Sequence, residues 1–250
     1  MIDTHCHLDH CDGPEEEVVG RARDAGVDRI ATVGMNGASI ERALAAAGDY
    51  DEVFAIVGRH PHETAGFGPA ELEEIERAAA HPDVRAIGET GLDYYRDHAP
   101  RADQRRAFEA QLELAGRVGL PVAIHMRAAE DDTFAILGEH ADRLPAVILH
   151  CFSAPDRLDD CVERGYLCSF AGNVTYPKAT DLQQAARDLP AELLLVETDA
   201  PYLSPQPVRG KRNEPAYVVH TAEHVAGLRG VAYEELERTV EANAARVLGW

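Results

Sequence analysis

The sequence predicts an α/β protein with one domain, a (β/α)8 TIM barrel that spans residues 1–250. Short runs rich in Val, Ile and Leu alternate with amphipathic stretches from end to end, as in buried parallel strands joined by helices. The length of 250 residues is also typical of one such barrel. A doubly wound open sheet is the main competitor, but no Gly-rich phosphate-binding turn follows the first run.

Eight apolar runs are expected to form the strands: 2–5, 29–34, 53–58, 84–88, 121–125, 146–150, 166–170 and 193–197. Helices are expected between them, at 14–25, 38–48, 69–80, 101–118, 129–141, 155–164 and 179–188. The stretch 215–248 is expected to form two further helices that break at Gly230 and Val231. Prolines stand where helices should begin and glycines where they should end: Pro14, Pro69, Pro155 and Pro215, then Gly26, Gly119 and Gly165.

The composition is strongly acidic, with a formal net charge of −20. Such a charge repels polyanions at long range, so broad electrostatic binding of nucleic acid is disfavoured, whereas a phosphodiester drawn in locally is not. No apolar stretch is long enough for a membrane span and no signal peptide precedes the first strand, so a cytoplasmic location is the expectation. The sequence is silent on oligomeric state, and a monomer is the default expectation. The five cysteines include no CxxC pair and predict no disulfide framework.

The first expected strand carries the motif His5-Cys6-His7. Residues i and i+2 of a strand share one face, so both imidazoles can point to the same barrel mouth. Two histidines of this kind also occur as hydrogen-bonded core residues, and the motif alone leaves both interpretations open. Asp3 or Asp9 is a candidate for the carboxylate that fixes an imidazole tautomer.

Glu89 ends the fourth apolar run and is followed at once by Thr-Gly-Leu-Asp. A buried carboxylate is costly unless it is paired or bound to a metal, and its two oxygens can bridge two cations. The alternative for Glu89 is an ion pair with Arg127 or Arg96.

Three further residues complete a set of six candidate metal ligands at strand ends: His125, His150 and Asp199. A parallel barrel gathers the C-terminal ends of its strands around one pocket, so the six are expected to converge. Imidazole and carboxylate suit Zn, Mn, Fe or Co better than calcium. Asp199 is expected to be catalytic as well, as the general base for a metal-activated water, with Glu197 on the same face in support.

A second histidine cluster, His60 and His62 in GRHPHE, follows the third expected strand. It is expected to contact substrate phosphate, support the ligands or hold an extra metal; a proline-fixed turn with exposed histidines is the alternative. Arg59, Arg127 and Lys211 are candidates for holding a phosphate or carboxylate. Four aromatic residues after these strands can stack on a base or pack at the rim: Tyr94, Tyr95, Phe152 and Tyr202.

The chain resembles the TatD-type metal-dependent hydrolases, within the amidohydrolase-like barrels. The resemblance covers essentially the whole chain, through DTHCHLD, GRHPHE, GETGLDYY, VAIHMR, LHCFS, ETDAPYL and KRNEPAYVVHT. It implies two divalent ions and hydrolysis of DNA, often from the 3′ end. The identity of the ions stays open among Zn, Mn, Mg, Fe, Co and Ni. The implied ligands are the same six residues: His5, His7, Glu89, His125, His150 and Asp199.

The chain departs from the family pattern at Arg59 and Ala154, which puts the exact substrate in doubt. The expected function is a deoxyribonuclease or phosphodiesterase that acts on DNA ends or short single strands. Hydrolysis of ester, amide or lactone bonds, including aminoacyl-tRNA esters, is the alternative, and a non-catalytic barrel is a third. Lysines at only 178 and 211 argue against relatives with a carboxylated lysine bridge. The irregular loop 200–214 is either functional or a tie to the C-terminal helices.

Overall fold

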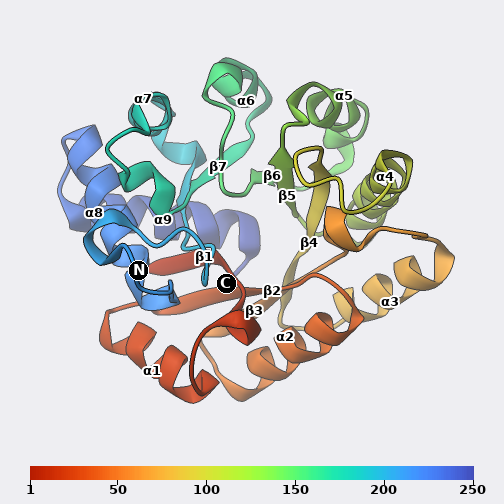
Figure 1. The fold of residues 1–250 in the computed structure, drawn as a ribbon, viewed down its shortest axis with the longest axis horizontal. Helices are drawn as coiled ribbons and strands as arrows, with labels where there is room; N and C mark the ends of the chain where they lie inside the picture. Colours follow the sequence, from red (N-terminus) through yellow and green to blue (C-terminus); the bar gives the residue numbers. More distant parts are fainter. The chain divides into compact units, whose positions relative to one another are not determined.

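The computed structural model describes all residues from Met1 to Trp250. The chain divides into two compact units, which are called unit 1 (Met1–Thr32 and Cys151–Trp250) and unit 2 (Val33–His150). Its eight strands follow one another in chain order, β1 to β8, in one sheet, and the pairs described are parallel. Figure 1 shows the order of strands and helices along the chain.

Unit 1 holds the first and last strands and the C-terminal helices. Its elements are β1 (Ile2–Cys6), α1 (Glu15–Asp24), the start of β2 (Arg29–Gly34), α6 (Leu158–Arg164), β7 (Leu167–Phe170), α7 (Thr180–Asp188), β8 (Leu194–Val196), α8 (Val218–Arg229) and α9 (Tyr233–Leu248). On one side β1 pairs with β2, and on the other Cys6 forms a bridge to Ala200 beyond β8. The last strand therefore returns to the first, as in a barrel and unlike an open sheet.

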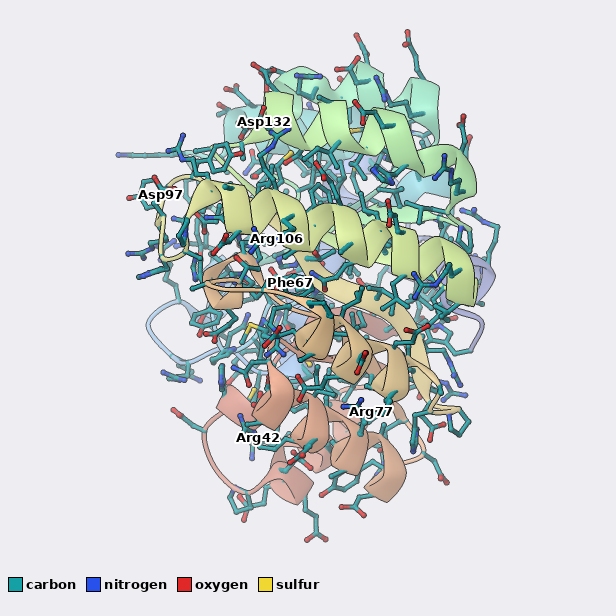
Figure 2. All side chains as sticks on the ribbon, turned by 90° about the vertical axis from the view of Figure 1, so that its right-hand side faces the viewer. Arg42, Phe67, Arg77, Asp97, Arg106 and Asp132 are labelled. Atoms are coloured by element: carbon teal, nitrogen blue, oxygen red, sulfur yellow. The ribbon has the colours of Figure 1, made fainter.

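Unit 2 holds α2 (Gly37–Asp49), β3 (Val53–Val57), α3 (Pro69–Ala79), β4 (Val84–Asp93), α4 (Arg101–Val118), β5 (Val122–Arg127), α5 (Glu130–His140) and β6 (Val147–Leu149). Figure 2 shows its four helices side by side, marked by Arg42, Arg77, Arg106 and Asp132. They pack on the strands through apolar faces, as α2 does on β3 and α4 on β4. The Val, Ile and Ala side chains of these strands are almost all fully buried, which is the core that holds the unit together.

Most expected elements lie within two residues of the observed ones, but β4 is a clear exception. It was expected to end at residue 88 and instead runs to Asp93, so Glu89 lies within the strand. The pairing of β4 with β5 shifts between Gly88 and Thr90 and then continues to Asp93 opposite Arg127. Glycines 88 and 91 have positive φ angles, and only glycine takes such angles readily. Both glycines therefore lie inside a strand that continues, whereas the expected strand ends with the apolar run at residue 88.

Two smaller differences concern the segment before α6 and the loop 200–214. Residues Pro155–Arg157 form a 3-10 turn, so the α-helix begins at Leu158. In the loop, the buried Asn213 amide donates to the carbonyl oxygens of Thr198 at 2.8 Å and Tyr202 at 2.6 Å. These bonds give the loop a structural role within unit 1. All five cysteines are free, and no helix combines the length and hydrophobicity that crossing a membrane requires.

Candidate metal centre

The first ligand group lies in unit 1 and consists of His5, His7 and Asp199. Both histidines come from β1 at alternate positions and are buried, and one side-chain ligand atom from each of the three residues lies within 4.8 Å of the others. The Asp199 amide donates to the His5 carbonyl at 2.9 Å, and the His7 amide donates to the Ala200 carbonyl at 2.8 Å. Backbone pairing therefore fixes Asp199 beside the two histidines.

Asp3 holds the segment that carries Asp199 from the other end of β1. Its carboxylate accepts the Thr198 backbone amide at 2.8 Å and the Thr198 hydroxyl at 2.5 Å, and its third donor is the His5 amide at 3.4 Å. Burial raises the pKa of Asp3 to about 8, although the hydrogen bonds from Thr198 act to lower it. The sequence suggested that Asp3 contacts an imidazole, but it binds backbone and hydroxyl groups instead.

Asp199 itself has a left-handed backbone conformation, with φ of 53°. Such angles are uncommon outside glycine and are found often at functional sites. The Asp199 side chain is 14% exposed, and its Oδ1 lies 3.6 Å from Nε2 of His7. Solvent can therefore reach the Asp199 carboxylate.

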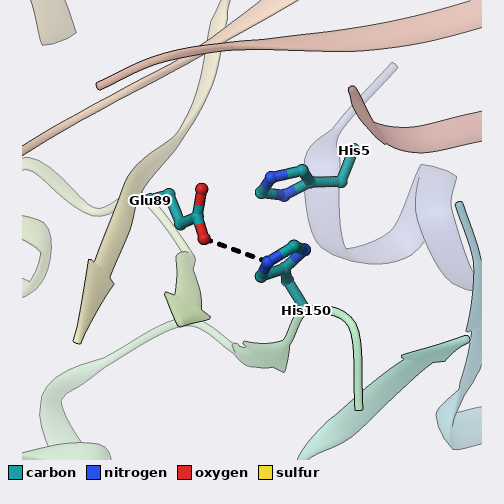
Figure 3. Close-up of side chains that lie close together, drawn as sticks. All are labelled: His5, Glu89 and His150. Atoms are coloured by element: carbon teal, nitrogen blue, oxygen red, sulfur yellow. Dashed lines mark ion pairs between the residues drawn. The ribbon is translucent and has the colours of Figure 1, made fainter. Parts of the chain in front are cut away.

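The second ligand group lies in unit 2 and consists of His60, Glu89 and His125, whose ligand atoms also lie within 4.8 Å of one another. Oε1 of Glu89 lies 2.6 Å from Nδ1 of His125 and 3.6 Å from Nε2 of His60. The same oxygen lies 3.0 Å from Nε2 of His150, the ion pair drawn in Figure 3. Glu89 is thus a buried carboxylate among three imidazoles.

The electrostatics of Glu89 follow from this setting. Burial alone would raise its pKa, but the charges of His150 and His60 and the hydrogen bond with His125 together hold the pKa well below its usual value. The alternative expected from the sequence, an ion pair with Arg127 or Arg96, is not formed. A carboxylate that stays ionised beside imidazole nitrogens is a good ligand for a divalent cation.

Asp93, which the sequence analysis missed, is the other buried carboxylate of unit 2. Its Oδ2 lies 2.8 Å from Nε2 of His62 and 3.2 Å from Nε2 of His125. Burial would raise the pKa of Asp93, but the bonds from His125, the Arg96 amide and His62 outweigh it and hold the pKa far below its usual range. The signal that could have found it is spacing, because positions 89, 91 and 93 alternate onto one face once the strand continues.

The remaining predicted site residues differ in where they lie. His60 joins the second ligand group, and His62 contacts Asp93. Arg59 is buried with its guanidinium 2.5 Å from Glu74 of α3, so a substrate contact through it stays a prediction. Glu197 is fully buried and accepts the Cys151 amide at 2.8 Å, which positions the segment after β6. Arg127 is exposed and lies over the ring of Tyr95.

The donor sets of the two groups suit a transition metal. Each group offers two imidazole nitrogens and one carboxylate oxygen from buried or half-buried side chains, which is the mixture preferred by Zn and by Mn, Fe or Co. Burying three polar side chains whose ligand atoms lie within 4.8 Å of one another costs free energy unless they have partners. The residues present therefore fit one divalent ion in each group.

Comparisons with known proteins point the same way. The model of the TatD-related DNase family matches residues 2–249. The uncharacterized metal-dependent hydrolase YabD of Bacillus subtilis is 38% identical over 250 residues, which cover 99% of this chain and 98% of YabD. The 3′-5′ ssDNA/RNA exonuclease TatD of Klebsiella pneumoniae is 37% identical over 94% of this chain and 91% of its own length.

Among solved structures, that of YjjV, a TatD homologue from Escherichia coli, superposes with a TM-score of 0.93 at 31% sequence identity. The match covers 100% of this chain and 98% of YjjV. It confirms the predicted α/β barrel.

Proposed function

The chain belongs to the TatD-related DNase family and is a metal-dependent hydrolase, and from this premise we propose that it is a deoxyribonuclease that cleaves phosphodiester bonds in single-stranded ends, as a 3′ exonuclease. The observation that carries the proposal is the pair of ligand groups, each with two histidines and one carboxylate. The relative from Klebsiella pneumoniae that is named an exonuclease for single-stranded DNA and RNA supports the substrate class.

In the proposal, His5, His7 and Asp199 hold one divalent ion, and Glu89, His125 and His150 hold a second together with His60. The ions would acidify the attacking water and neutralise the charge that develops on the phosphate oxygens. Two ions and their identity, among Zn, Mn, Mg, Fe, Co and Ni, are part of the proposal. A bridging role for Glu89, the convergence of the two groups on one pocket and a third ion near His60 and His62 stay predictions.

Asp199 is the residue to which we assign the proton transfer. Its side chain is the partly exposed carboxylate of the first group, and the Asp3–Thr198 bonds fix the segment before it. It accepts a proton from the water whose oxygen forms the new bond to phosphorus. The bond from phosphorus to the 3′ oxygen of the remaining strand breaks, that oxygen takes a proton from solvent, and the terminal nucleotide is released. Asp3 and Glu197 take no direct part, because their carboxylates bind backbone groups.

The proposal also covers the setting in which the enzyme works, as a cytoplasmic monomer acting on DNA ends or short single strands. The net charge of −20 supports the preference for ends, because long duplexes carry a dense negative charge that this surface repels.

The test is hydrolysis by metal-depleted protein to which Mn or Zn has been restored. The substrates are a 5′-labelled single strand, the same sequence as a duplex, and an aryl ester and a lactone for the alternative activities. We expect cleavage of the single strand from its 3′ end and a large loss of rate in Asp199→Asn, while the exposed Asp51→Asn serves as the matched control. Wild-type protein that binds metal and hydrolyses only the ester or lactone contradicts the nuclease proposal, and full activity in Asp199→Asn contradicts the proton transfer.

A further inference from the structure

An exposed tyrosine stands directly beyond the second ligand group. Tyr95 follows β4 by two residues, and at 64% it is the most exposed large hydrophobic side chain of the protein. A single exposed aromatic side chain is ordinary on a protein surface. Two features set Tyr95 apart: the hydrogen bonds that fix its backbone and the arginines that lie near its ring.

One carboxylate fixes both Tyr95 and a candidate ligand. Oδ1 of Asp93 accepts the backbone amides of Tyr95 at 3.0 Å and Arg96 at 2.8 Å. Oδ2 of the same carboxylate contacts His62 at 2.8 Å and His125 at 3.2 Å. Because Asp93 is fully buried, the turn that carries Tyr95 is held in a fixed place relative to His125. The backbone of Tyr95 is therefore preformed beside the second ligand group.

Two arginines lie close to the Tyr95 ring. The guanidinium carbon of Arg127 lies 4.2 Å from the ring centroid and that of Arg96 lies 5.6 Å from it. Arg127 stands opposite Asp93 in the pairing of β4 with β5, and its carbonyl accepts the Tyr94 amide at 2.9 Å. Its side chain is exposed, so an anionic ligand can reach the guanidinium. Figure 2 shows the loop after β4, marked by Asp97, at the surface beyond the start of α4.

We propose that Tyr95, Arg96 and Arg127 form a nucleotide subsite, in which Tyr95 stacks on an unpaired base and Arg127 contacts an adjoining phosphate. The subsite deepens the proposed nuclease function and rests on it for its place in catalysis. An aromatic ring with arginine on it is the usual surface for single-stranded nucleic acid, because every base has a π-face and the backbone is anionic. A base within a duplex has both faces covered by its neighbours and cannot use this ring.

The experiment measures binding without metal, so that it does not depend on activity. Metal-depleted protein in EDTA is titrated into a short single strand that carries 2-aminopurine near its 3′ end, whose fluorescence falls on stacking. We expect Tyr95→Ala to weaken binding about tenfold or more and to abolish the fluorescence change, whereas Tyr95→Phe keeps both. Arg127→Ala weakens binding and reduces the slope of log K against log salt by about 0.7, the value for one phosphate of a single strand. The exposed Arg238→Ala, on α9 of unit 1, is the matched charge control.

The outcomes separate the subsite from the proposed function. Unchanged binding and stacking in Tyr95→Ala, or no binding by the wild type, overturns the subsite. Circular dichroism checks that the variants fold, and if Tyr95→Ala does not, Arg127→Ala with its salt slope carries the test. Hydrolysis of bis(p-nitrophenyl) phosphate by metal-loaded wild type is measured in parallel. If this hydrolysis is absent while binding depends on Tyr95, the nuclease proposal is refuted and the subsite stands. If hydrolysis is normal while binding does not depend on Tyr95, the subsite is refuted and the nuclease proposal stands.

Discussion

The Asp3 carboxylate and Thr198 are joined by two hydrogen bonds, one to the backbone amide and one to the hydroxyl. These bonds link the strand that carries His5 and His7 to the residue that precedes Asp199. The positions of the first ligand group therefore depend on this buried pair.

Asp3→Asn tests this pair, because it replaces one acceptor oxygen by a donor. We expect about a 10- to 100-fold loss of metal affinity at the first group, the usual cost of disturbing residues that orient ligands. Competition with a chromophoric chelator measures it, and Thr198→Ser, which keeps the hydroxyl, is the control. Affinity equal to that of the wild type would show that the pair does not position Asp199.

Gly91→Ala tests the path of β4. A Cβ at this position would collide with the carbonyl oxygen of His125, and φ is 137°. We expect the free energy of unfolding to fall by about 2 kcal/mol or more, measured in urea. The control is Gly227→Ala in α8, where a Cβ meets nothing and alanine should favour the helix. Equal stability of the two variants would contradict the account of β4.

Asp93→Ala should impair two properties at once, because the carboxylate holds both His125 and the Tyr95 turn. We expect weaker metal binding at the second group together with weaker binding of single strands, measured by the same chelator and fluorescence titrations. Tyr95→Ala should lose only the second property. If Asp93→Ala lowers neither, the carboxylate does not couple them.

Tyr233 on α9 predicts a specific loss of stability at alkaline pH. Burial and the nearby carboxylates of Glu237, Glu223, Glu241 and Glu234 together raise its pKa to about 12. In the unfolded chain the pKa of the phenol is near its usual value of about 10. Ionisation therefore favours the unfolded state, and the free energy of unfolding falls, as pH rises from 10 to 12. The contribution of Tyr233 to the free energy of unfolding is fully present below pH 10 and is lost as pH rises from 10 to 12.

The difference in unfolding free energy between the wild type and Tyr233→Phe, measured across that window, should therefore change with pH. Tyrosinate absorbance of the folded proteins supplies the matching pKa. A constant difference between pH 9 and 12 would refute the prediction.

Much of the fold could be predicted because its signals are local. Apolar runs, helix-starting prolines such as Pro69 and C-terminal glycines such as Gly119 each depend on a few neighbouring residues. The extent of β4 could not be predicted, because Gly88 and Gly91 weaken a strand locally, whereas the pairing with β5, which continues to Asp93, is a tertiary contact.

The residues of the candidate site also differ in whether their signals are local. Histidines and carboxylates after apolar runs could be recognised one by one, and His5 with His7 by their spacing. Asp93 was missed because its position on the ligand face depends on the continuation of β4. The engagement of Arg59 with Glu74 was equally hidden, because it joins a turn to a helix that only tertiary packing brings near.

The most direct test of the central claim is the number of divalent ions bound per chain, measured by elemental analysis after reconstitution and desalting. We predict two ions in the wild type, one in a variant with His5 and His7 both replaced by alanine, and one in a variant with Glu89 and His125 so replaced. A wild type that retains no ion, or variants that each retain two, would contradict the assignment of one ion to each ligand group.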